Sequence, residues 1–96
     1  MKKPTLIDAV VFERLGDLPQ PERANCLLAL HELQDSFGRP HVHSGLGIRK
    51  LRGKTFECRA TLRLRYLFQD RSDCLYVFAL VTHDEVQHRL RSGRLE

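Results

Sequence analysis

The residues best suited to chemistry lie at alternating positions within one short segment. Four charged side chains occupy odd-numbered positions there: Glu57, Arg59, Arg63 and Arg65. An uninterrupted strand would place all four on one face of a sheet. Three guanidinium groups on one face repel each other unless an anion or a carboxylate lies among them. Because the planar guanidinium donates paired hydrogen bonds to phosphate, this pattern indicates a phosphate-binding face.

A histidine farther along the chain could complete such a site. His83 lies where an apolar segment ends and a helix signal begins, and the ends of elements often support active sites. Histidine is the side chain best suited to proton exchange near neutrality. Metal-free RNA cleavage needs a group that takes the 2′-OH proton, cations that stabilise the pentacoordinate phosphate, and an acid that protonates the departing 5′-oxygen. The sequence contains candidates for all three.

Each of these residues also has a simpler interpretation, and the spacing leaves both open. Glu57 with Arg59 or Arg65 could form a surface ion pair that contributes little. His83 could be a residue of a helix start without chemistry. Cys58 and Cys74 occupy apolar positions of the pattern and are expected in the core rather than at a site.

No metal or cofactor is expected. His41 and His43 have the alternate spacing of strand ligands, but no third ligand is nearby in the sequence. The chain has neither a glycine-rich phosphate loop nor a paired-cysteine motif.

Basic charge is concentrated in one segment of the chain. Residues 1–38 carry four basic and six acidic side chains, whereas residues 39–96 carry twelve basic and six acidic ones. Between positions 49 and 65 a single carboxylate, Glu57, stands among seven basic residues: Arg49, Lys50, Arg52, Lys54, Arg59, Arg63 and Arg65. Such a patch is typical of proteins that bind a polyanion, usually nucleic acid. The alternative is a solvated strand face that prevents edge aggregation.

Length and composition predict a single soluble domain over residues 1–96. The hydrophobic content of 42% and the charged content of 29% are typical of globular proteins. The longest uncharged apolar segment, 74–81, is far shorter than the roughly 20 residues that a membrane span needs. Asp8 follows the Met1-Lys2-Lys3 start closely, so no secretory signal is expected. Three widely spaced cysteines predict reduced thiols in a cytoplasmic protein.

The first half of the chain is expected to be largely helical. Residues 5–8 have the form of a helix start that Gly16 and Pro19 would close, although the β-branched residues nearby leave a strand open over 5–12. A second helix is predicted over 21–37, with Pro21 at its first position and Gly38 and Pro40 ending it.

The second half changes to strand periodicity. Apolar or small residues alternate with largely charged ones over 56–69, and a turn cluster follows at 70–73. The apolar run 74–81 is typical of a strand covered on both faces. Residues 82–85 fit a capping box that starts a last helix, with Val86 and Leu90 facing inward. The predicted fold is α+β: an N-terminal helical hairpin packed on a small antiparallel sheet of three or four strands, with a short C-terminal helix.

From about Gly45 onward the chain resembles the RelE/ParE superfamily, the small toxins of prokaryotic type II toxin–antitoxin systems. Four short motifs carry the resemblance in the family's order: G-I-R-K-L-R-G at 47–53, F-E-C-R at 56–59, L-R-Y-L-F at 64–68 and L-V-T-H-D-E-V at 80–86. Residues 12–19 followed by 21–37 look like the family's N-terminal helical hairpin.

The resemblance implies a metal-independent endoribonuclease that cuts mRNA, on or off the ribosome, and is silenced by a cognate acidic antitoxin. By that resemblance Glu57 and Arg59 form a catalytic pair, Arg65 binds the phosphate, and His83 protonates the leaving group. Glu57 or Lys54 would assist the 2′-OH. The RNA-binding set would be Lys50, Arg52 and Lys54 in a basic loop, together with Arg63.

Three departures from the family pattern keep alternatives open. The family usually turns before the strand of the second arginine, but residues 60–63 lack a turn signal, so a bent strand or a tight hairpin is possible. Leu64 replaces a common aromatic residue, and residues 1–11 match the family's first strand poorly. The alternative functions are a non-enzymatic ParE-like inhibitor and a catalytically degenerate binding module.

Overall fold

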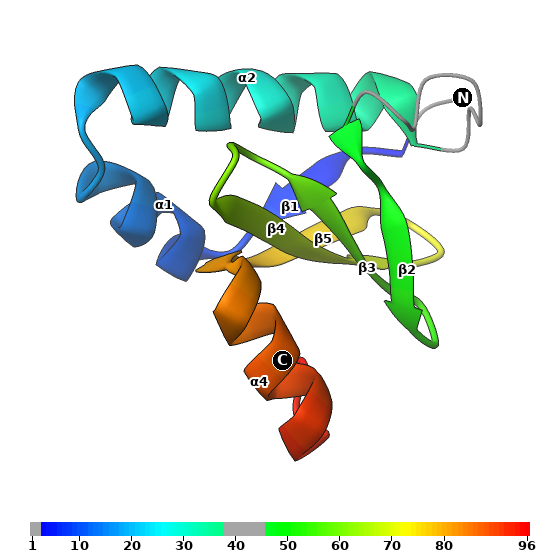
Figure 1. Ribbon diagram of the computed structural model, residues 1–96. Helices are drawn as coiled ribbons and strands as arrows, with labels where there is room; N and C mark the ends of the chain where they lie inside the picture. The colour runs from blue at the N-terminus through cyan, green and yellow to red at the C-terminus, as the bar shows by residue number, and fades with distance from the viewer. Residues whose placement is uncertain (1–2, 38–45) are drawn as a thin grey trace.

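The computed structural model describes residues 3–37 and 46–96, which form a five-stranded sheet with helices on both of its faces (Figure 1). The sheet order is β1-β5-β4-β3-β2, with β1 parallel to β5 and the other pairs antiparallel. No helix in these two segments is long and apolar enough to span a membrane. The described elements are β1 (Thr5–Ile7), α1 (Ala9–Gly16), α2 (Gln20–Ser36), β2 (Arg49–Arg52), β3 (Thr55–Arg59), β4 (Leu64–Asp70), β5 (Leu75–Thr82) and α4 (His83–Ser92).

The α+β class and the last helix are confirmed, but the prediction of a wholly antiparallel sheet of three or four strands is wrong. A short strand, Thr5–Ile7, precedes the helices and joins β5 in parallel through backbone bonds from Leu75 to Pro4 and from Asp8 to Val77. The helix start predicted at residues 5–8 is therefore wrong: α1 begins at Ala9, and the side chain of Asp8 caps it by accepting from the Val10 N–H. The partner strand lies some seventy residues away, which is why local pattern did not show this pairing.

The second helix is confirmed over Gln20–Ser36, and it covers one face of the sheet. Its buried residues pack over the middle strands: Cys26, Ala29, Leu30 and Leu33. The buried Tyr66 hydroxyl on β4 donates a 2.7 Å hydrogen bond to the Cys26 carbonyl, which ties the helix to the sheet. The ring of Phe37, just after the helix, meets Phe56 and Phe68 edge-on. The helix-ending signals at Gly38 and Pro40 lie outside the described residues.

The C-terminal helix α4 packs on the opposite face of the sheet. The predicted capping box is confirmed: the Thr82 side chain accepts from the Glu85 N–H, and the Glu85 carboxylate accepts from the Thr82 N–H. Val86 is fully buried and Leu90 partly buried against an apolar cluster that includes Leu67. Because helices lie on both faces, β5 is buried on both sides, as its uninterrupted apolar run predicted.

The alternating segment 56–69 is a hairpin, not one continuous strand. The chain reverses at residues 60–63, where the Leu64 carbonyl accepts from the N–H groups of Ala60 and Thr61, at 2.9 and 3.2 Å. The Thr61 hydroxyl accepts in turn from the Leu64 N–H. A threonine side chain thus satisfies the turn in place of the glycine, asparagine or aspartate that marks most hairpin turns. The predicted turn at 70–73 is confirmed between β4 and β5.

The carboxylate of Glu85, which caps α4, should contribute a pH-dependent share of the free energy of unfolding. Burial raises the pKa of Glu85, but hydrogen bonds from Thr82 and the charge of Arg14, whose guanidinium lies 3.3 Å away, bring the net pKa below 4.5. The ionised form therefore stabilises the fold above about pH 4.5, and this contribution is lost as the pH falls through the lower folded pKa.

We expect Glu85→Gln to lower the free energy of unfolding at pH 7 by about 0.5 kcal/mol, a surface-pair value because 43% of the side chain is exposed. The difference from wild type should shrink toward pH 3 in urea titrations. A difference that is constant between pH 7 and pH 3 would contradict this assignment.

The burial of the cysteines predicts that their thiols react slowly in the native protein. All three thiols are free and buried, and burial raises the pKa of Cys58 to about 12. Since the thiolate is the reactive species, the native protein should resist Ellman's reagent at pH 8 and release three thiols per chain after unfolding. A thiol that reacts rapidly in the native state would show that this core opens readily.

Candidate functional site

The pairing of β3 with β4 brings two of the predicted arginines together. Arg59 and Arg65 are direct cross-strand partners, and Arg65 in turn lies opposite Val81 on β5. Glu57 lies on the same face, two residues before Arg59. The alternate residues of the two strands, such as Phe56 and Tyr66, point into the core under α2. Pairing across the hairpin therefore places Glu57, Arg59 and Arg65 on one face, as we expected from a single continuous strand.

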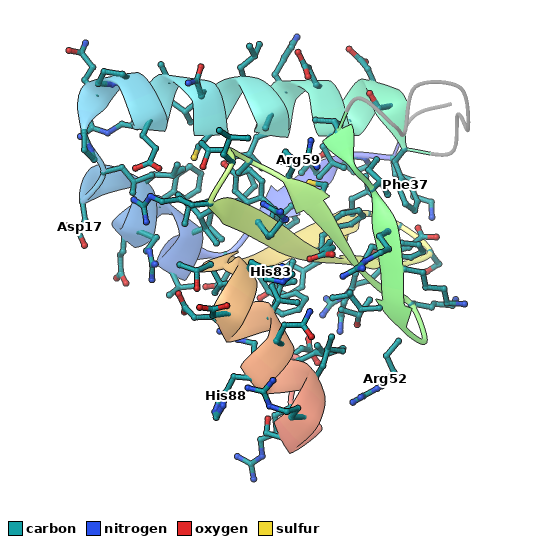
Figure 2. All side chains as sticks on the ribbon, in the orientation of Figure 1. Asp17, Phe37, Arg52, Arg59, His83 and His88 are labelled. Carbon is teal, nitrogen blue, oxygen red and sulfur yellow. The ribbon has the colours of Figure 1, made fainter. Side chains whose placement is uncertain are left out.

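His83 lies near the same end of the sheet as this arginine pair. It is the first residue of α4 and directly follows Thr82, which pairs with Leu64 at the start of β4. Its side chain is exposed. Figure 2 shows His83 at the start of α4 and Arg59 at the end of β3, nearer to α2. The predicted histidine and arginines thus gather near one end of the strands, on an open surface.

Arg65 has a local structural task that the sequence did not reveal. Its Nη1 donates to three carbonyl oxygens of the hairpin turn, those of Thr61 and Leu64 at 3.2 Å and Leu62 at 3.4 Å. Its side chain is half-buried. The guanidinium folds back over the turn and stabilises it, so one of its nitrogens is already occupied.

Arg59, by contrast, has an unpaired guanidinium. It forms no ion pair or side-chain hydrogen bond with any residue that the structure describes, and it is exposed. It lies against Gly47, whose φ of +63° suits glycine; a Cβ there would lie 3.8 Å from the Arg59 guanidinium. A full set of donors is therefore available to a ligand at this position.

The catalytic carboxylate predicted at Glu57 is buried. It is only 5% exposed, and its Oε2 lies 2.6 Å from Nη2 of Arg49, its direct partner on β2. Its Oε1 is also buried and has no hydrogen-bond partner within the described segments. The ion pair expected as the simpler interpretation exists, but with Arg49 rather than with Arg59 or Arg65. Sequence reasoning counted Arg49 in the basic patch without assigning it to the site.

The predicted RNA-binding residues do not form one cluster. Lys50 and Arg52 lie on β2 rather than in the expected loop, and Lys54 lies in the β2–β3 turn. Lys54 is about 16 Å along the strand from Arg59, and the Arg52 guanidinium donates to the Leu90 carbonyl of α4.

Arg63 lies in the hairpin turn and is held by α2. Its guanidinium lies 2.7 Å from the Glu22 carboxylate, which raises its pKa. It is therefore less available to a ligand than Arg59.

A groove of about 620 Å³ lies between α2 and the β3–β4 turn. Leu28, Ala29 and Leu46 contribute apolar surface to it, and Leu62, 92% exposed, stands at the turn. Among the four predicted catalytic residues, Arg59 alone lines it. The candidate site is thus an open face beside the groove rather than a closed pocket.

The described part of the chain holds no group of three histidine, cysteine or carboxylate side chains that could bind a metal ion. His41 and His43 lie outside the described residues.

No family model matches the chain, and no curated protein matches its sequence. Solved structures, however, match its fold. The archaeal RelE–RelB complex from Pyrococcus horikoshii OT3 contains a chain that is 17% identical with a TM-score of 0.69, and the match covers 85% of this chain and 96% of that one.

Two further solved structures match the fold of this chain. The RelB–RelE antitoxin–toxin complex from Methanococcus jannaschii contains a chain that is 16% identical with a TM-score of 0.65, covering 86% of this chain and 95% of that one. The YoeB dimer from Staphylococcus aureus is 15% identical with a TM-score of 0.64, covering 86% and 99%. These matches over most of each chain show that this chain has the fold of the RelE and YoeB structures.

Proposed function

We propose that this protein is the toxin of a type II toxin–antitoxin system and acts as a metal-independent endoribonuclease on mRNA at the ribosome, in the cytoplasm. The observation that carries the proposal is the direct pairing of Arg59 with Arg65 near the start of α4, within a fold shared with RelE and YoeB. An open basic face suits a large, anionic substrate better than a small molecule, which a closed pocket would bind.

The proposed reaction is a transesterification. The ribose 2′-oxygen attacks phosphorus and loses its proton to a water molecule, the bond to the 5′-oxygen breaks, and a 2′,3′-cyclic phosphate and a 5′-hydroxyl result. Arg59 and Arg65 hold the phosphate and stabilise the charge that develops on it, and His83 donates a proton to the departing 5′-oxygen.

Removal of the 2′-OH proton is the step to which the described side chains contribute least. Glu57 is on the right face but is buried behind Arg49, and Lys54 is exposed but lies far along the strand. The proposal therefore rests mainly on electrostatic stabilisation by the arginines and on the acid His83.

An acidic antitoxin is the proposed partner. The structural neighbours include chains crystallised with the antitoxins RelB and YefM. An acidic amphipathic segment could neutralise the basic 49–65 region and cover apolar side chains exposed beside it, such as Leu28 and Leu62.

A second candidate function is a non-enzymatic inhibitor that uses the same face to occupy its target. Two observations favour it: Glu57 is buried in an ion pair, and one nitrogen of Arg65 is occupied by the hairpin turn. This alternative requires positive charge at the face but no proton transfer by His83.

Variants at two exposed residues distinguish these functions. Induction of the wild type should arrest growth and cleave ribosome-bound mRNA. Arg59→Ala and His83→Ala should each lower the cleavage rate by about a hundredfold or more, because each removes charge stabilisation or the acid from the transition state. Cleavage should persist in EDTA.

Arg91→Ala serves as the matched control, because Arg91 is exposed on α4 and has no partner among the described residues. Growth arrest that survives His83→Ala and Arg59→Lys would instead favour the inhibitor. Wild type that is harmless and leaves ribosome-bound mRNA intact would remove the nuclease proposal.

The two exposed arginines near the groove should differ in RNA affinity. Arg59→Ala should weaken binding to single-stranded RNA about tenfold, since it removes an unpaired guanidinium. Arg63→Ala should weaken it less than threefold, because Glu22 already neutralises Arg63. Fluorescence anisotropy at fixed salt measures both affinities. Equal losses would show that the Arg63–Glu22 pair opens for RNA.

A further inference from the structure

Arg49 and Glu57 form an ion pair between β2 and β3 that the proposed chemistry does not use. Glu57 is 5% exposed, whereas 58% of the Arg49 side chain is exposed. The two residues are direct partners across β2 and β3, and their side chains meet at 2.6 Å. A buried carboxylate thus holds an exposed guanidinium at a defined place on the surface.

Within the described segments, the Glu57 carboxylate has no polar partner other than Arg49. Its Oε1 is buried and makes no hydrogen bond to any residue of the described segments, so Arg49 is its only contact of opposite charge there. Burial without further donors makes separation of the pair costly, because the carboxylate would remain uncompensated in a low-dielectric environment. Arg49 is therefore held more firmly than an ordinary surface arginine.

Arg49 and the unpaired Arg59 are diagonal neighbours across β2 and β3 on one face, and such neighbours lie about 7–8 Å apart at their backbones. The contact to Glu57 uses Nη2, and the guanidinium has further N–H groups to offer. Arg59 follows Glu57 by two residues on the same face and packs against Gly47, which precedes Arg49 by two residues. One carboxylate against two guanidiniums leaves an excess positive charge at this place.

We infer that Arg49 and Arg59 form a phosphate-binding pair for a nucleic-acid backbone, and that Glu57 is the positioning residue that orients Arg49. This inference rests on the proposed nucleic-acid function and refines it: Glu57 acts through Arg49 and does not itself accept the 2′-OH proton. A pre-oriented guanidinium loses less conformational freedom on binding than a mobile one, which increases affinity.

Substitution of Glu57 gives a test in which a pure charge effect and an orientation effect change RNA affinity in opposite directions. Glu57→Gln raises the net charge by one, so a purely electrostatic effect would tighten binding to RNA. If Glu57 orients Arg49, the same variant weakens binding about threefold or more. The probe is a 2′-O-methyl RNA decamer, which cannot be cleaved because its 2′-oxygen is blocked, with affinity measured by anisotropy across a salt series.

Two variants of Arg49 complete the test. Arg49→Lys keeps a charge beside Glu57 but loses the forked donors, so affinity should fall about fivefold while the salt dependence stays unchanged. The double variant Arg49→Gln with Glu57→Gln removes both charges and avoids a stranded carboxylate. It should bind as weakly as Arg49→Lys or more weakly, with a smaller salt dependence. Arg91→Gln is the control for loss of one surface charge, and urea unfolding monitors the stability of each variant.

The outcomes separate this inference from the proposed function. Tighter binding by Glu57→Gln, or unchanged binding by a folded Arg49→Lys, overturns the inference even if the wild type cleaves mRNA. Wild type that fails to bind the decamer at low salt overturns it as well. Conversely, the predicted pattern of affinities in a protein that cleaves no RNA would support the phosphate-binding pair and overturn the nuclease proposal.

Discussion

The register between β3 and β4 is the constraint on which the rest of the molecule depends. On one face, Phe56 pairs with Phe68 and Cys58 with Tyr66, and these four side chains form part of the core under α2. The Tyr66 hydroxyl adds a buried hydrogen bond to α2. Because side chains alternate across a strand, this packing forces Arg59 and Arg65 to the other face. A slip of one residue would place guanidinium groups in the apolar core, at a cost that no surface contact could offset.

The opposite face shows how a small protein tolerates a dense basic surface. Arg63 is paired with the carboxylate of Glu22 and Arg49 with that of Glu57, whereas Arg65 keeps its charge and donates hydrogen bonds to carbonyl oxygens of its own turn. Arg59 remains without such a partner among the described residues. These local contacts reduce the repulsion between the cations that make them, and Arg59 presents its unpaired positive charge next to the groove beside α2.

The junction of β5 and α4 sets the place of His83. The capping box of Thr82 and Glu85 ends the strand and starts the helix at the same point, and Arg14 links this turn to α1. Val86 and Leu90 then hold α4 against the sheet. His83, one residue beyond the strand, is therefore placed by a well-anchored backbone while its side chain stays exposed. Such an arrangement suits a residue that must meet a ligand from solvent.

Local pattern was sufficient for elements whose contacts are close in sequence. The helix Gln20–Ser36, the interior strand Leu75–Thr82 and the capping box at residues 82–85 depend on periodicity and short-range hydrogen bonds, and the sequence determined them. The alternation of charged residues also placed Glu57 and Arg59 on one face of a strand, whereas the position of Arg65 on that face depends on the β3–β4 register. The motifs from residue 47 onward indicated the fold of the solved neighbours, which are only 15–17% identical, although the number and direction of the strands were predicted wrongly.

Only the tertiary structure decided the features that depend on contacts between distant segments. The strand Thr5–Ile7 forms by pairing in parallel with β5, which lies some seventy residues away. Three residues are too short a segment to show a strand pattern in the sequence. The turn at 60–63 is stabilised by Thr61 and Arg65 rather than by a glycine. The burial of Glu57 and its pairing with Arg49 required β2 to lie beside β3. Whether a charged side chain is free or already bound depends on its neighbours in space, which residue spacing along one strand does not specify.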